Sequence, residues 1–367
     1  MKNSTKKIGL RMGTVFWLLE LVCFLSACNT EKEEVVELDD RVKTEALDLT
    51  VDTVWVDSVF LHARRFFVYR DSVLIVVNKP NSDCATLQLY NLKTQRPIAD
   101  YLSQGKGPNE VLEASVNLEG DILILRDFIR KQVAFISLDS LLSVKGYTIP
   151  LRQYRYISFG LNRMGNGRTV FENPYCFQAK KQGIDNKASR FLLGDAQTTL
   201  ADFGTYRYNT FNVSQGFVVM NPDRNVLVYA SLSEPVVELR DTVLNLQKRI
   251  KGPDSFDDIR YKVREDDTSI PDVVYQGIVP YAYVGYCCDS VGFYLAYTDA
   301  RLSGEMTDER RFPCWIFRFD WAGNLVNSYA VGRYVNALSS GSDIHTIYAT
   351  GYDDDMMPQL VRLTLPS

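Results

Sequence analysis

The feature that most constrains the fold is a repeat of paired apolar runs. From about Leu47 onward, short runs rich in β-branched and aromatic residues recur between turn residues, and no long stretch keeps a helical period. Each copy contains a turn, an apolar run, a polar loop and a second apolar run, at a spacing typical of propeller blades. The six copies open at Asp71, Gly120, Asn166, Asp223, Asp289 and Gly341.

These copies predict an all-β fold, a six-bladed β-propeller over residues 47–367. Blades of four antiparallel strands pack face to face around an axis, and closure of the ring protects their edges. The sixth copy ends at Ser367 without room for an outermost strand, which Leu47–Asp57 can supply. We therefore expect the last blade to combine both ends of the chain. Two β-sandwiches in tandem are the alternative, but they account for neither the six copies nor the missing strand.

The chain begins with a pattern typical of a lipoprotein signal peptide. Four basic residues precede an apolar run, Met12–Phe24, that is too short to span a bilayer, although Glu20 is unusual within such a run. The run is followed by Leu-Ser-Ala-Cys, which resembles the bacterial lipobox. We expect residues 1–27 to be removed and Cys28 to be lipidated, so that the membrane is one partner of the protein. The alternative is a membrane-buried structural cysteine.

Residues 28–46 are predicted to be a flexible acidic tether between the lipidated cysteine and the propeller. The segment Glu31-Lys32-Glu33-Glu34 is followed by further acids, without apolar periodicity. Lys32 and its acidic neighbours resemble the export signal of Bacteroidota-type lipoproteins, which implies an outer-membrane protein exposed at the cell surface. An acidic spacer without sorting meaning is the alternative.

Composition and charge argue against several classes of partner and cofactor. A net charge of −4 argues against a nucleic-acid partner, because such proteins need a basic surface to displace counterions from phosphates. Only two histidines exist, so zinc sites and His-based triads are disfavoured. Asp353–Asp355 favours a solvated loop over a calcium site. Five cysteines besides the lipidated Cys28 remain after processing, without metal-ligand spacing, so no disulfide framework, metal or other cofactor is predicted. They are Cys84, Cys176, Cys287, Cys288 and Cys314.

The loop Gly105-Lys106-Gly107-Pro108-Asn109-Glu110 is the most distinctive motif. Glycines let backbone N–H groups approach an anion, but no Gly-Lys-Ser/Thr and no helical pattern follow, so a nucleotide-binding loop is disfavoured. The structural interpretation gives Gly105 and Gly107 positive φ angles, lets Pro108 stiffen the turn and makes Glu110 an acceptor for backbone N–H groups. A partial echo, Lys251–Phe256, favours this interpretation.

The lipobox, the acidic segment, the six repeats and this loop together resemble the TolB-like six-bladed β-propeller lipoproteins of gut Bacteroidota. In that family a Gly-x-Gly-Pro-x-Glu loop follows the first full blade. Asn109 stands where the family often has a second glycine, and Val111 where it often has phenylalanine. The resemblance implies a fold and a location, but no shared activity.

Polar and aromatic loop residues are the candidates for ligand binding. On the expected face of the propeller they are Asp127, Phe128, Arg130, Tyr175 and Arg301. Aspartate and arginine in one tight loop can instead clamp that loop, and the sequence leaves both interpretations open.

The leading functional hypothesis is a lipid-anchored binding or scaffold module for a glycan, a peptide or another envelope protein. The alternative is a propeller-type hydrolase, lactonase or lyase with its active site at the channel mouth. No catalytic residue is assigned, because the sequence holds no concentrated catalytic set, and fold alone does not give function.

Overall fold

The computed structural model of the chain describes residues 34–366 except 81–82, 128, 154–161, 164–168, 173–190, 195–198, 204–215, 222–225, 242–244, 265–271, 304–307, 309, 311 and 354. Residues 35–367 form one compact unit. Among the described residues, no helix is long and apolar enough to cross a membrane.

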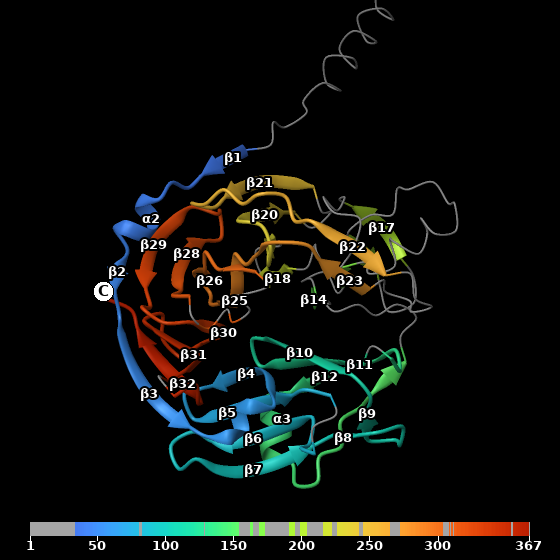
Figure 1. Ribbon diagram of the computed structural model, residues 1–367. Helices are drawn as coiled ribbons and strands as arrows, with labels where there is room; N and C mark the ends of the chain where they lie inside the picture. Colours follow the sequence, from blue (N-terminus) through green and yellow to red (C-terminus); the bar gives the residue numbers. More distant parts are fainter. Residues whose placement is uncertain are drawn as a thin grey trace, which may run out of the picture. The chain divides into compact units, whose positions relative to one another are not determined.

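Most strands belong to antiparallel sheets of four or five strands that follow one another along the chain (Figure 1). Five of these sheets are described with their side chains. The first two contain β4 (Ala63–Tyr69), β5 (Val73–Asn78), β6 (Leu87–Asn91) and β7 (Arg96–Tyr101), then β10 (Ala114–Glu119), β11 (Ile122–Asp127), β12 (Gln132–Ser137) and β13 (Arg152–Gln153). The others contain β18 (Gly216–Asn221), β19 (Val226–Ser231), β20 (Val236–Arg240) and β21 (Leu246–Lys251); β25 (Tyr283–Cys288), β26 (Gly292–Tyr297), β28 (Trp315–Asp320) and β29 (Leu325–Ala330); and β30 (Val335–Ser340), β31 (Thr346–Tyr352), β32 (Pro358–Thr364) and β3 (Thr50–Val56).

A further four-stranded sheet is described by its backbone strands alone. It contains β14 (Asn162–Arg163), β15 (Thr169–Glu172), β16 (Phe191–Gly194) and β17 (Thr199–Phe203). Three pairs of short strands lie in the connections: β8 (Ser103–Gln104) with β9 (Glu110–Val111), β22 (Tyr261–Arg264) with β23 (Asp272–Tyr275), and β24 (Val279–Pro280) with β27 (Arg301–Leu302). Among the described residues outside the N-terminal segment, the helical elements with defined bounds are η1 (Ser58–Leu61) and α3 (Leu138–Ser143).

The sheets pack as blades around a common centre. Each large apolar cluster joins two neighbouring sheets: β4–β7 to β10–β13, β18–β21 to the β25–β29 sheet, that sheet to β30–β32, and β30–β32 with β3 to β4–β7. The first strands of successive sheets also contact one another, β18 with β25, β25 with β30 and β30 with β4. A Cβ at Gly285 would come within 3.1 Å of the Asn336 carbonyl oxygen, so glycine lets β25 and β30 approach closely.

The pairs of apolar runs in the repeat are confirmed as strands. Each pair forms the second and third strands of one sheet, as with β5 and β6 or β31 and β32. The expected sharing of a blade between the two chain ends is also confirmed, because β3 pairs antiparallel with β32 from Thr50 opposite Thr364 to Val56 opposite Gln359 (Figure 1).

The start of this strand was predicted wrongly. The segment Leu47–Asp48 is a separate strand, β2, and pairs in parallel with β29 on the neighbouring sheet. The outer edge of β29 offers unpaired backbone groups there, and two residues suffice to use them.

The prediction of a flexible tether as far as residue 46 is also wrong for residues 34–46. They form β1 (Glu34–Glu37), which extends the sheet at β21, and the short helix α2 (Arg41–Thr44). The Leu38 N–H donates to the Lys251 carbonyl at 2.9 Å, and Lys251 Nζ lies 3.2 Å from Glu37 Oε1. The acidic segment thus pairs with a basic edge strand. We call residues 35–48 the N-terminal strap, since they contact two neighbouring sheets.

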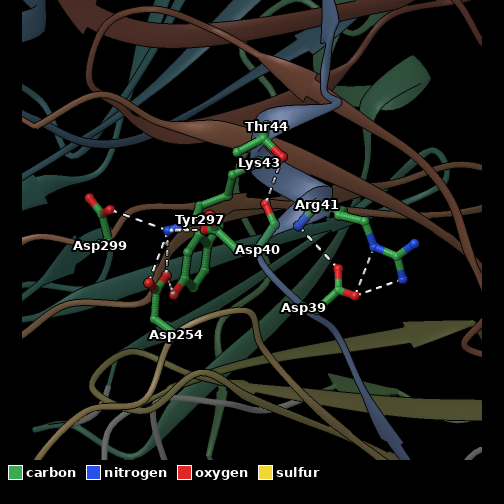
Figure 2. A network of polar contacts seen from close by, with 8 residues as sticks. All are labelled: Asp39, Asp40, Arg41, Lys43, Thr44, Asp254, Tyr297 and Asp299. Atoms are coloured by element: carbon green, nitrogen blue, oxygen red, sulfur yellow. Dashed lines mark hydrogen bonds and ion pairs between the residues drawn. The ribbon is translucent and has the colours of Figure 1, made fainter.

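The strap is fixed by Lys43 (Figure 2). Its Nζ lies 2.9 Å from Asp254 Oδ1, 3.2 Å from Asp40 Oδ1 and 3.5 Å from Asp299 Oδ2, and only 11% of its side chain is exposed. The Tyr297 hydroxyl donates to Asp254 Oδ2 at 2.5 Å. Burial alone would lower the pKa of Lys43, but hydrogen bonds to Asp254 and Asp40 outweigh it and raise that pKa above 10.5.

Replacing Lys43 by methionine is expected to lower the free energy of unfolding by about 1 to 3 kcal/mol, because two partly buried carboxylates lose their cation. A raised pKa means that this contribution is fully present below 10.5, the unfolded value, and is lost as pH rises through the folded value. In urea unfolding experiments from pH 7 to 11, the free energy of unfolding of the variant should therefore lie below that of the parent by a constant amount up to about pH 10. The difference should shrink above that pH. Lys93→Met, at an exposed turn, is the control; an equal deficit there would contradict the role of Lys43.

Candidate functional site

The Gly-Lys-Gly-Pro-Asn-Glu loop is held around its own glutamate. The Gly107 N–H donates to Glu110 Oε2 at 2.6 Å, which confirms Glu110 as an acceptor. Gly105 has the predicted positive φ, +155°. Gly107 does not have the positive φ that was predicted for it. A Cβ at Gly107 would lie 2.9 Å from Glu110 Oε2, and a Cβ at Gly105 would lie closer still, so a side chain at either position would displace the Glu110 carboxylate.

Asp127 and Arg130 hold the same loop from outside. Asp127, fully buried at the end of β11, accepts the Leu112 N–H at 2.7 Å and the Arg130 N–H at 3.0 Å. Arg130 Nη1 donates to the carbonyl oxygens of Gly107 at 2.7 Å and Glu110 at 2.5 Å. These contacts match the clamp interpretation that the sequence left open beside ligand binding.

The other candidate residues lie elsewhere. Phe128 and Tyr175 are outside the described residues. Arg301 is exposed on β27, its guanidinium 5.4 Å from the centre of the Phe256 ring, and lines a cavity of about 550 Å³. The structure therefore brings Asp127 and Arg130 together but leaves Arg301 on the connections of a different sheet.

A polar bridge that the sequence did not predict crosses the centre of the propeller. Arg65 Nη1 on β4 donates to Asn117 Oδ1 on β10 at 2.9 Å and to the Tyr286 hydroxyl on β25 at 2.6 Å. Three first strands from three sheets thus meet at one guanidinium. We call Arg65, Asn117 and Tyr286 the central bridge.

Aromatic rings hold the bridge in place. The Arg65 guanidinium carbon lies 4.3 Å from the centre of the Tyr286 ring and 5.0 Å from that of Phe67. Phe217 on β18 packs against Tyr286 with ring centres 5.1 Å apart. Contact with ring faces fixes the plane of a guanidinium while leaving its N–H edges available.

The bridge lies between two cavities of the central channel, and both Arg65 and Tyr286 line each of them. The small cavity, about 190 Å³, lies where the first strands begin; its polar and aromatic lining is Arg64, Arg65, Ser115, Phe217, Tyr286 and Asn336. The large cavity, about 700 Å³, lies where these strands end, and its lining includes Glu119, Asn221, Asp289 and Ser340.

A second arginine lies behind the small cavity. Arg126 on β11 is fully buried, and its Nη2 donates to the Ser115 hydroxyl at 3.0 Å. Burial lowers the pKa of Arg126 to about 9, although the nearby Tyr286 and Glu119 act in the opposite direction. The residue remains a cation at neutral pH.

The thiols in the channel wall are poor nucleophiles. Cys287 and Cys288 both line the large cavity. Burial raises the pKa of Cys287, and raises that of Cys288 to about 12, so both remain protonated at neutral pH. Among the described residues, no group of histidine, cysteine or acidic side chains could hold a metal ion.

The sheets and the channel together define the chain as a β-propeller protein. No family model and no curated protein matches it. Among solved structures it is similar to a Bacteroides fragilis protein described as exported, with a TM-score of 0.53 at 10% identity over 91% of this chain and 99% of that one. It is also similar to a Bacteroides vulgatus member of the DUF4221 family, with a TM-score of 0.56 at 10% identity over 87% and 96%. These similarities support the fold; the resemblance to TolB-like lipoproteins stays a prediction.

Proposed function

We propose that the protein is a lipid-anchored binding module that holds its ligand in the central channel. The central bridge is the observation that carries this proposal. Three sheets fix one arginine between two cavities, so the site is rigid before a ligand arrives, and a preorganised site loses little entropy on binding. A glycan, a peptide or a segment of another envelope protein is the expected ligand.

Binding is favoured over the hydrolase, lactonase or lyase alternative by the contacts of Asp289, one of the two acids among the described residues that line the large cavity. Asp289 Oδ1 accepts the N–H groups of Val291 and Gly292 at 2.8 Å, and its Oδ2 accepts the Tyr294 hydroxyl at 2.9 Å. A carboxylate with these three donors is held as a turn residue rather than as a general base.

The complete ring is proposed to have six blades, with the β14–β17 sheet as the third. The support is that this sheet has the same strand order as its neighbours and that β14 contacts β18. The lipobox, the Lys32-Glu33-Glu34 segment and the two Bacteroides neighbours, one of them described as exported, support an outer-membrane lipoprotein of the TolB-like type with its propeller at the cell surface.

Cys28→Ala is expected to move most of the protein from the membrane fraction to the soluble fraction, or to leave it unprocessed. The diacylglyceryl group on Cys28 carries two chains, which is what stable anchoring requires. Fractionation followed by immunoblotting measures the change, with Cys84→Ala as the control. Normal membrane partitioning of the Cys28 variant would contradict lipidation, and protection from added protease in whole cells would contradict surface exposure.

Binding in the channel is tested by closing it from either end. A glycan and peptide screen first identifies a ligand. Asn336→Trp then fills most of the small cavity and Ser340→Trp narrows the large one, while Lys93→Trp on an outer turn is the control. At least one channel variant should weaken binding tenfold or more, since a ligand and an indole ring cannot share the space. Unchanged affinity in both would move the site elsewhere, with the cavity at Arg301 as the next candidate.

A further inference from the structure

The Arg65 guanidinium has donors left over for a ligand. A guanidinium has five N–H donors, two of them on Nη1. In Arg65 these two donate to Asn117 Oδ1 and to the Tyr286 hydroxyl. Nε and Nη2 donate to no residue in the part of the chain that the structure describes. These two nitrogens form the edge that binds a carboxylate with two parallel hydrogen bonds.

The charge of the two cavities differs in sign. The described lining of the small cavity includes Arg64 and Arg65 but no aspartate or glutamate, whereas that of the large cavity includes Glu119 and Asp289 beside Arg65. Arg64 Nη1 lies 3.6 Å from Glu113 Oε1, so its charge is partly offset. The positive charge of Arg65 remains, and an anion is therefore attracted to the small cavity.

The wall of the small cavity adds a hydroxyl and a ring. Because Arg126 Nη2 donates to the Ser115 oxygen, the Ser115 hydrogen is free to point at a ligand, with a buried cation directly behind it. Phe217 on β18 offers a partly exposed ring. The volume of about 190 Å³ holds about six water molecules, and therefore a small group rather than a chain.

We propose that the small cavity binds the carboxylate of a small ligand or ligand terminus, with Arg65 as the bidentate donor, Ser115 as a second donor and Phe217 as the apolar wall. This inference rests on the proposed binding function and names the chemical group that the channel recognises. An acidic sugar and the C-terminus of a peptide both carry that group.

Four small probes test the inference on the purified protein by isothermal titration calorimetry. D-glucuronate and N-acetyl-L-alanine represent the two sources of a carboxylate, and D-glucose and N-acetyl-L-alanine amide are their neutral counterparts. At least one acid should bind tenfold or more tightly than its counterpart, and the better acid identifies the source. Equal binding of acids and neutral probes, absence of binding by both acids, or tighter binding of inorganic phosphate than of either acid would overturn the proposal.

Two variants connect the probes to the site. Arg65→Gln should weaken binding of the better acid at least tenfold without changing the affinity for neutral probes, while Arg70→Gln, in the exposed turn directly after the same strand, should leave both unchanged. If Arg65→Gln shows no cooperative thermal unfolding, Ser115→Ala takes its place, and its affinity for the better acid should fall threefold or more. Full affinity in the folded variant would overturn the inference.

The outcome is separable from that of the proposed function. A ligand from the screen that Ser340→Trp excludes, together with no binding of either acid, would overturn the carboxylate site and leave channel binding intact. If both tryptophan variants still bind the ligand and the acid with full affinity, both the channel-binding function and the carboxylate site are contradicted.

Discussion

Deleting Thr50–Val56, strand β3, is expected to abolish folding of the propeller. The strand covers β32 and buries Trp55, whose ring centre lies 5.5 Å from that of Phe60 and 5.3 Å from that of Tyr90. Loss of a buried tryptophan alone costs about 3 to 5 kcal/mol, and an uncovered edge strand adds a site for aggregation. Together these losses approach the whole stability of an ordinary domain, about 5 to 15 kcal/mol.

Circular dichroism and size-exclusion chromatography of the purified deletion variant measure this effect. Deletion of Glu34–Glu37, strand β1, is the matched control, because it removes another outer strand from the same N-terminal segment. Three of its four residues are exposed, so the loss should be small. A β3 deletion that stays monomeric and melts like the parent would show that the blade does not need strands from both ends of the chain.

Asp127→Ala is expected to lower the free energy of unfolding by about 2 to 5 kcal/mol, because the Leu112 and Arg130 N–H groups lose their acceptor beside a buried strand end. Asp127→Asn should cost less, since one oxygen can still accept a hydrogen bond. Urea denaturation measures both variants.

The control for Asp127 is Asp121→Ala in the same sheet. Asp121 has 58% of its side chain exposed and lies 3.7 Å from Arg70, so its loss should stay within about 0.5 kcal/mol. A similar small loss at Asp127 would mean that it does not clamp the loop, and would return it to the ligand-binding candidates.

The sequence predicts the middle strands of the blades well because they are apolar on both faces. Every residue of β5, Val73–Asn78, is buried, and such a strand reads as a continuous hydrophobic run. The N-terminal strap lacks this signal. Its strand β1 has an exposed valine among glutamates, and it becomes a strand only because the edge of β21 provides partners.

The central bridge could not be predicted for a different reason. Arg65 and Tyr286 are 221 residues apart in the sequence, and their contact exists only because the ring brings β4 and β25 together. Arg64 and Arg65 are indistinguishable as letters, and the register of β4 shifts between Ala63 and Arg65, so regular strand alternation does not predict which arginine joins the bridge. By contrast, Asp127 and Arg130 were found because an acid and a base within one turn form a local pattern. That pattern indicated a loop clamp as readily as a ligand site.

The pairing of β3 with β32 also has a kinetic consequence. Thr53 and Gln359, whose side chains hydrogen-bond across this pair, are 306 residues apart. Contacts between such distant residues form slowly, because the chain must lose the entropy of a very long loop before the contact stabilises it. During synthesis or export, β3 emerges long before β32, so β3 stays unpaired until most of the other blades have been made. A chaperone that shields this unpaired strand would be needed until β32 is available. Chains truncated before β32 would keep the strand unpaired and would be prone to aggregate.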